Sequence, residues 1–186
     1  PTIIYIKDIP NAEKLNQYLE PRIIQWSQQD KGISKTNAGG WHSKTDMNTK
    51  KEYDPLTTEL FNMQEEIYQK ENLSRKPVCG NMWANINYPK CYNRPHVHPN
   101  SLFSGVYYVT APKNSGNFMI YDPRPGVQMT MPNRKEGKLS PELWREVHYE
   151  PKAGRCIMFP SWLWHEVKPN ESNQARISVS FNFLQR

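Results

Sequence analysis

The sequence lacks several features that would place it in other classes of protein. Its 186 residues include only three cysteines, Cys79, Cys91 and Cys156, and no two of them have CxxC spacing. An odd number of cysteines excludes a fully paired disulfide framework, so we expect a reducing, cytoplasmic setting. No apolar run approaches the length of a membrane span, and the opening residues PTIIYIKDIP do not have the pattern of a signal peptide. We therefore expect no membrane partner.

Long runs of basic residues are also missing, although the formal net charge is +6. A positive charge can attract nucleic acid or an anionic small molecule. The basic residues are scattered, however, and none of their runs is longer than a pair such as Lys50-Lys51. This distribution favours a solvated surface and indicates no specific nucleic-acid partner. A homodimer is compatible with these bulk properties.

The first part of the chain has helical periodicity. Apolar residues recur near helical spacing over residues 11–29, where Pro21 is expected to kink or divide the helix. A second helix is predicted over residues 55–71, with Asp54 as its N-cap. From Val78 onward, short β-prone runs alternate with turns, which predicts a sandwich or small barrel. We expect one domain, in which residues 1–75 give helical support and residues 76–186 form the β core.

One strand near the end of the sequence has two clearly different faces. In ARISVSFNFL, residues 175–184, apolar side chains alternate with Arg176, Ser178, Ser180 and Asn182. The polar face could point to solvent, or it could line the inside of a barrel that binds an anion. Arginine offers a rigid fork of donors that matches a carboxylate, and Ser178 adds a donor on the same face.

The segment NRPHVHPN, residues 93–100, holds two histidines one residue apart. On an extended strand the side chains of His96 and His98 point to the same side and can converge on one ion, although such pairs are often ordinary surface residues. A third histidine, His165, ends the apolar block CIMFPSWLWHEV, where it is either a buried structural residue or a ligand. His42 is expected at the surface, His148 in a structural role, and Trp83, Trp162 and Trp164 in the core or the pocket wall.

Taken in order, these motifs resemble those of the Fe(II)/2-oxoglutarate-dependent oxygenases, and in particular a bacterial and phage branch similar to the prolyl 4-hydroxylases. The resemblance covers roughly residues 78–184 and implies a mainly β fold with N-terminal helices, the double-stranded β-helix or jelly roll also found in cupins. It implies His96 and His165 as iron ligands. It further implies that Arg176, Ser178 and Tyr108 hold the distal carboxylate of 2-oxoglutarate and that Tyr88 lines the co-substrate site.

One position departs from the family's pattern, because His98 stands where the family's HxD motif has a carboxylate. Three neutral imidazoles carry no charge, so the iron would be more Lewis-acidic than in a site with one carboxylate. Three outcomes are open. His98 ligates the iron, which we favour; or it turns away and water or another carboxylate such as Asp122 completes the shell; or the site is inactive.

The resemblance implies an enzyme that uses Fe(II), 2-oxoglutarate and O₂ to hydroxylate a C–H bond, with release of succinate and CO₂. A peptidyl or prolyl substrate is the first hypothesis and a small molecule the second, with specificity residing in loops such as residues 122–148. Two alternatives remain: a three-histidine, cupin-like dioxygenase that does not use 2-oxoglutarate, and an inactive jelly-roll binding module.

Overall fold

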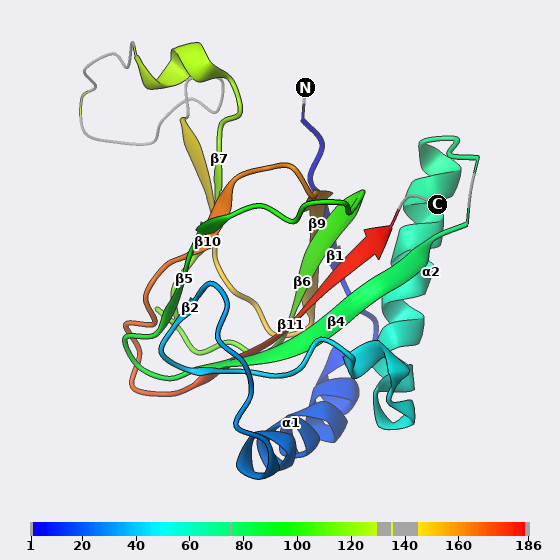
Figure 1. Ribbon diagram of the computed structural model, residues 1–186, viewed down its shortest axis with the longest axis vertical. Helices are drawn as coiled ribbons and strands as arrows, with labels where there is room; N and C mark the ends of the chain where they lie inside the picture. Colours follow the sequence, from blue (N-terminus) through cyan, green and yellow to red (C-terminus); the bar gives the residue numbers. More distant parts are fainter. Residues whose placement is uncertain (1, 75, 130–134, 136–144, 185–186) are drawn as a thin grey trace.

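Two antiparallel β-sheets face each other in the computed structural model of the protein, which describes residues 2–74, 76–129, 135 and 145–184 (Figure 1). The six-stranded sheet has the order β1-β9-β6-β11-β4-β3. Its strands are β1 (Tyr5–Asp8), β9 (Arg155–Pro160), β6 (Phe103–Thr110), β11 (Arg176–Leu184), β4 (Val78–Asn87) and β3 (Trp41–His42).

The five-stranded sheet has the order β2-β5-β10-β7-β8. Its strands are β2 (Asn37–Ala38), β5 (Tyr92–His96), β10 (His165–Val167), β7 (Phe118–Tyr121) and β8 (Glu146–Tyr149). From β4 onward the chain passes repeatedly from one sheet to the other, which is the winding of a jelly roll. The predicted fold class, mainly β with N-terminal helices, is confirmed.

Two helices cover the outer face of the six-stranded sheet (Figure 1). They are α1 (Ala12–Gln29) and α2 (Asp54–Lys70), each within one residue of its predicted bounds. No helix among the described residues is both long and apolar enough to span a bilayer. The short 3-10 helices are η1 (Met47–Thr49), η2 (Lys51–Tyr53) and η3 (Pro125–Gln128).

Two details of the helices differ from the prediction. Pro21 does not divide α1, which continues through it, because Leu19 and Ile23 on either side are fully buried and hold both halves of the helix on the sheet. Asp54 is the first residue of α2 and Tyr53 is the N-cap, since the 3-10 turn η2 leads directly into the helix.

The main core lies between the helices and the six-stranded sheet. The apolar face of β11 supplies Ile177, Val179, Phe181 and Phe183, which are at most 2% exposed. They belong to one cluster with helix residues such as Leu60. The opposite face of the same sheet is directed toward the five-stranded sheet, so the alternation predicted for residues 175–184 separates a core face from an interior pocket face.

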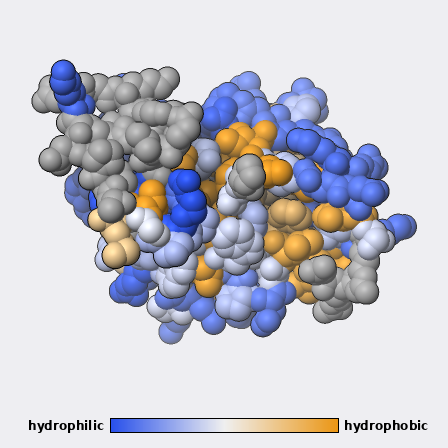
Figure 2. All heavy atoms as spheres, turned by 90° about the horizontal axis from the view of Figure 1, so that it is seen from above, coloured by the Kyte–Doolittle hydropathy of each residue, from blue (hydrophilic) through white to orange (hydrophobic). Residues whose placement is uncertain are grey.

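Three aromatic side chains differ from the sequence prediction in their burial. Trp162 and Trp164 are 58% and 56% exposed, because they lie in the turn between β9 and β10 and only Leu163 between them points inward. His42 is buried, because β3 pairs with β4 and carries it against the sheet. Elsewhere the face seen from above is largely hydrophilic, with apolar patches between the polar residues (Figure 2). Of the predicted loop 122–148, residues 130–134 and 136–144 lie outside the described part.

Candidate metal centre and adjoining pocket

Strand pairing brings the three predicted histidines together. β5 and β10 are antiparallel neighbours, and His96 lies directly opposite His165 in their register. His98 follows β5, and its backbone N–H donates to the carbonyl oxygen of Ser161 at 3.0 Å, which fixes the segment against the turn after β9. One ring nitrogen from each of the three histidines lies within 4.8 Å of the others. Nε2 of His98 is 3.1 Å from Nε2 of His165.

Backbone carbonyls set the orientation of two of these rings. Nδ1 of His96 lies 2.6 Å from the carbonyl oxygen of Arg94, and Nδ1 of His165 lies 2.8 Å from that of Leu163. A carbonyl oxygen only accepts, so each Nδ1 carries the proton and each Nε2 presents its lone pair. Metal-binding histidines commonly have this arrangement, because the outer hydrogen bond fixes the tautomer and the ring plane.

Burial keeps the three imidazoles neutral. Burial, with a smaller contribution from neighbouring His96, lowers the pKa of His98 to about 3. Burial also lowers the pKa of His96 and, together with the two neighbouring rings, places that of His165 well below its usual range. A neutral imidazole is the form that binds a metal, so the cluster presents lone pairs at neutral pH without a proton having to leave.

The described part of the chain supplies no carboxylate to this cluster. Asp122, the alternative ligand considered above, forms an ion pair with Arg124 at 2.5 Å and lines a different cavity, next to Ile4 and Tyr149. His98 has not turned away, since its ring faces His165. The geometry therefore favours three histidines over two histidines and Asp122.

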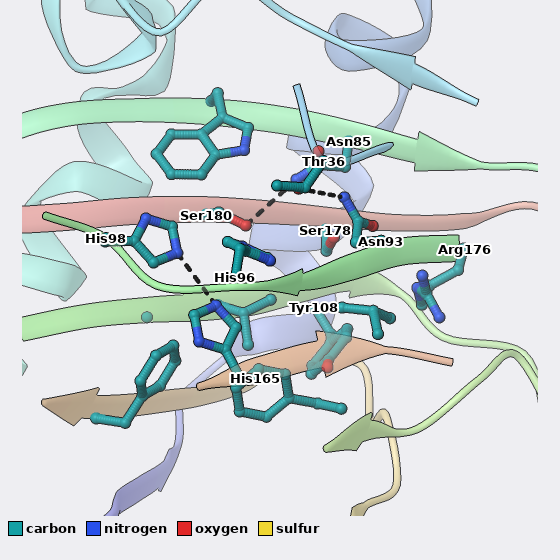
Figure 3. A pocket seen from close by; sticks show the side chains of 16 residues that line it. Thr36, Asn85, Asn93, His96, His98, Tyr108, His165, Arg176, Ser178 and Ser180 are labelled. Atoms are coloured by element: carbon teal, nitrogen blue, oxygen red, sulfur yellow. Dashed lines mark hydrogen bonds between the residues drawn. The ribbon is translucent and has the colours of Figure 1, made fainter. Parts of the chain in front are cut away.

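The pocket extends from the histidines to a buried arginine at the start of β11 (Figure 3). Arg176 is 1% exposed, and its Nη1 donates to the carbonyl oxygens of Ser115 and Gly116. Among the described residues, its Nε has no hydrogen-bond partner and no carboxylate forms an ion pair with it. A buried charge without a counter-ion is costly. An anion in the pocket would neutralise it.

Glycine is required at position 116 for this arrangement. Gly116 has a φ of 92°, and a Cβ there would lie 2.1 Å from the carbonyl oxygen of Lys168 and 2.9 Å from Nη1 of Arg176. Only a residue without a side chain lets the loop carbonyl approach the guanidinium.

Two further predicted residues lie beside Arg176. Tyr108 is 1% exposed and its hydroxyl has no hydrogen-bond partner in the described part of the chain, while Ser178 is 6% exposed. Burial raises the pKa of Tyr108 to about 12, opposed by the nearby Arg176 charge. The hydroxyl therefore stays protonated and can donate. Both residues line the pocket.

Tyr88 is the predicted site residue that the structure does not bring to the pocket. Its side chain is 48% exposed and does not line the cavity. On β4 the residues that face the pocket are Trp83 and Asn85, and Tyr88, just beyond the strand, is out of phase with them. The structure therefore does not bring Tyr88 to the pocket, and its role at the co-substrate site stays a prediction.

The sequence reasoning missed part of the polar wall. Asn85 donates to Ser180 at 3.2 Å, and Asn93 donates to Thr36 at 3.4 Å. Period-two alternation on β4 would have found Asn85, whereas Thr36 comes from a segment with no pattern of its own and reaches the site because β2 pairs with β5.

The donor set fits both groups that the resemblance implies. Three neutral imidazole nitrogens within 4.8 Å of one another suit a divalent transition metal. At the other end, a buried guanidinium Nε and a tyrosine hydroxyl, both without a partner among the residues that the structure describes, suit a carboxylate. A small dianion that chelates the metal at one end and meets Arg176 at the other would satisfy both.

Comparison with known proteins gives one family and one fold. The sequence profile of the family described as "Putative 2OG-Fe(II) oxygenase" matches residues 81–182. No curated protein sequence matches the chain. A prolyl-4-hydroxylase of Pseudomonas putida is 17% identical, with a TM-score of 0.71 and coverage of 100% of this chain and 94% of its own.

Two other solved structures have the same fold. The viral collagen prolyl hydroxylase of Paramecium Bursaria Chlorella virus-1 is 15% identical, with a TM-score of 0.63 and coverage of 98% and 96%. The non-haem α-ketoglutarate-dependent epimerase SnoN from nogalamycin biosynthesis is 13% identical, with a TM-score of 0.71 and coverage of 99% and 77%. At these identities the likeness concerns the arrangement of the chain and not the substrate.

Proposed function

We propose that this chain, which belongs to the family of 2OG-Fe(II) oxygenases, hydroxylates a C–H bond of its substrate while 2-oxoglutarate and O₂ are converted to succinate and CO₂. One observation carries the proposal: a cluster of three neutral histidines shares one pocket with a buried arginine that has no counter-ion among the described residues.

Each end of the pocket has a distinct task. His96, His98 and His165 would hold Fe(II), which with 2-oxoglutarate supplies the activation of O₂. Arg176 would accept the distal carboxylate, helped by the hydroxyl of Tyr108 and by Ser178. The aromatic rings of Phe118 and Phe159 lie against His165, with ring centroids at 5.5 and 4.7 Å, and exclude water from that side of the cluster.

A protein or peptide substrate, with proline as the first candidate residue, is supported by the likeness to prolyl hydroxylases. A small-molecule substrate is the alternative, supported by the likeness to SnoN. Hydroxylation of proline-containing peptides and of small cyclic compounds, measured side by side by mass spectrometry as a gain of one oxygen, distinguishes the two.

The experiment that tests the reaction is succinate formation from 2-oxoglutarate under air with Fe(II). We expect slow succinate formation even without substrate, lost in His165→Ala and retained in His148→Ala, since His148 lies on β8 and contacts Glu146 at the surface. Metal-dependent O₂ uptake that is indifferent to 2-oxoglutarate would instead indicate a three-histidine dioxygenase. Absence of both, with folded and iron-loaded protein, would indicate a binding module.

A further inference from the structure

The three histidines are not held in the same way. His96 and His165 each have a backbone carbonyl on Nδ1, at 2.6 and 2.8 Å. For His98 the structure gives no such bond in the part of the chain that it describes, and the contact of its Nε2 with His165 joins two prospective ligand atoms. An imidazole without an outer hydrogen bond can rotate about its Cβ–Cγ bond, so another interaction has to fix its plane.

A tryptophan contacts the ring of His98. Trp83 on β4 lies with its ring centroid 5.8 Å from that of His98, at an interplanar angle of 28°. The ring of His98 is also nearly parallel to that of His165, at 3° with centroids 5.0 Å apart, but the two rings meet through their Nε2 atoms. Trp83 is therefore the aromatic side chain that lies over the ring of His98 and restricts its rotation.

Trp83 is itself held by a third ring. His42 stacks on it at 5.5 Å and 8°, and Nδ1 of His42 bonds to the carbonyl oxygen of Ser43 at 2.6 Å. The backbone N–H of Ser43 donates to the carbonyl oxygen of Ala84 at 2.9 Å, and Ser43 Oγ accepts from the N–H of Ala84 at 2.9 Å. These bonds fix the His42 segment to the strand that carries Trp83.

We propose that Trp83 is a positioning residue for His98: its indole face, backed by His42, holds the imidazole in the plane in which Nε2 meets the metal. This rests on the proposed metal centre. A neutral imidazole presents one usable nitrogen, so the plane of its ring has to be fixed for Nε2 to meet the metal.

The chain offers a matched control. Trp41 is 8% exposed and Trp83 is 9% exposed, and they lie on neighbouring strands. Trp41 packs edge-on against Trp26 and belongs to the core on the other face of the sheet. Trp41→Leu therefore removes an indole of equal burial without touching the histidine cluster.

The test is Co(II) affinity, followed by the visible absorption of the bound ion in the full chain. We expect Trp83→Leu to weaken Co(II) binding by about 10-fold or more, the usual loss for an outer partner of a ligand. Trp41→Leu should leave the affinity within about threefold, since it contacts no ligand. Trp83→Phe, which keeps an aromatic face, should restore most of the affinity. If Trp83→Leu does not fold by circular dichroism, Trp83→Met, with its flexible filling side chain, takes its place.

A double-mutant comparison separates positioning from general support. In the His98→Asp background, Trp83→Leu should cost much less Co(II) affinity than in the native background, because the carboxylate does not depend on the stack. Equal losses in the two backgrounds, or native affinity in Trp83→Leu, would overturn the positioning role and leave the metal centre intact. Absence of Co(II) binding by the native protein would overturn both.

Discussion

The two ends of the pocket differ in charge, since one end is neutral and the other is positive. At one end, one buried and two half-buried imidazoles carry no charge, and two of them are oriented by backbone carbonyls. At the other end, Arg176 carries a charge that is nine-tenths or more buried, and its Nε has no partner in the part of the chain that the structure describes. The lone pairs of the neutral end bind a cation, and the buried charge of the other end binds an anion. The two ends together therefore fit a divalent metal and an organic dianion.

The largest effect, a loss of metal affinity, should come from removing His165, which is a ligand with or without His98. His165→Ala takes away the buried ligand opposite His96, and we expect metal affinity to fall by more than about 100-fold, beyond the loss of an outer partner. Equilibrium dialysis against Fe(II) under argon measures it. His148→Ala is the control, and equal affinity in the two variants would contradict the metal centre.

Changing the charged end should affect the anion and spare the metal. For Arg176→Met we expect 2-oxoglutarate affinity to fall by about 100-fold, since truncating one member of a buried charge pair costs about 2–5 kcal/mol. Fe(II) affinity should stay within about threefold. Arg176→Lys keeps the charge but loses the fork, and should recover only part of the affinity. If Arg176→Met weakened the binding of Fe(II) as much as that of 2-oxoglutarate, the arginine end and the histidine end of the pocket would not be independent.

Within the metal end, substitution of His98 tests whether the third histidine is a ligand. We expect His98→Ala to weaken Fe(II) binding by about 10- to 100-fold, clearly more than His42→Ala or His148→Ala. His98→Asp should bind Fe(II) well, because a carboxylate at this position gives a two-histidine, one-carboxylate set. Small and equal losses in the three alanine variants would exclude His98 as a ligand.

The smallest effect should come from one hydroxyl group. Tyr108→Phe removes a buried O–H that has no partner among the described residues, so the free protein should be no less stable. Affinity for 2-oxoglutarate should fall by about 10-fold, the value of one hydrogen bond to a charged group. Thermal shift without ligand and calorimetric titration with 2-oxoglutarate measure the two quantities. Lower thermal stability with unchanged affinity for 2-oxoglutarate would contradict the role of the Tyr108 hydroxyl as a donor to the co-substrate.

Local patterns predicted which residues share a face of a strand, although they left open whether that face lines a pocket. Period-two alternation placed Arg176 and Ser178 on one face of β11, and the HxH spacing placed His96 and His98 side by side. Alternation does not say which strands become neighbours, so the approach of Thr36 through the pairing of β2 with β5 was not predictable.

Positions near strand ends and turns were the least predictable. Tyr88 lies one residue beyond β4 and out of phase with the pocket face, and Trp162 and Trp164 face solvent from a turn. An apolar residue type alone does not determine burial at such positions. The stack of Trp83 on His98 likewise depends on how β4 lies across from the segment after β5, which only the folded chain specifies.

The most direct test of the central claim is anaerobic titration of the Fe(II)-loaded protein with 2-oxoglutarate, followed by visible absorption. Chelation of the metal by the 2-oxo acid should produce a metal-to-ligand charge-transfer band that saturates in the native protein. The same band should require about 100-fold more 2-oxoglutarate in Arg176→Met. A folded, iron-loaded native protein that shows no band, or an Arg176→Met variant that saturates at the native concentration, would contradict the account.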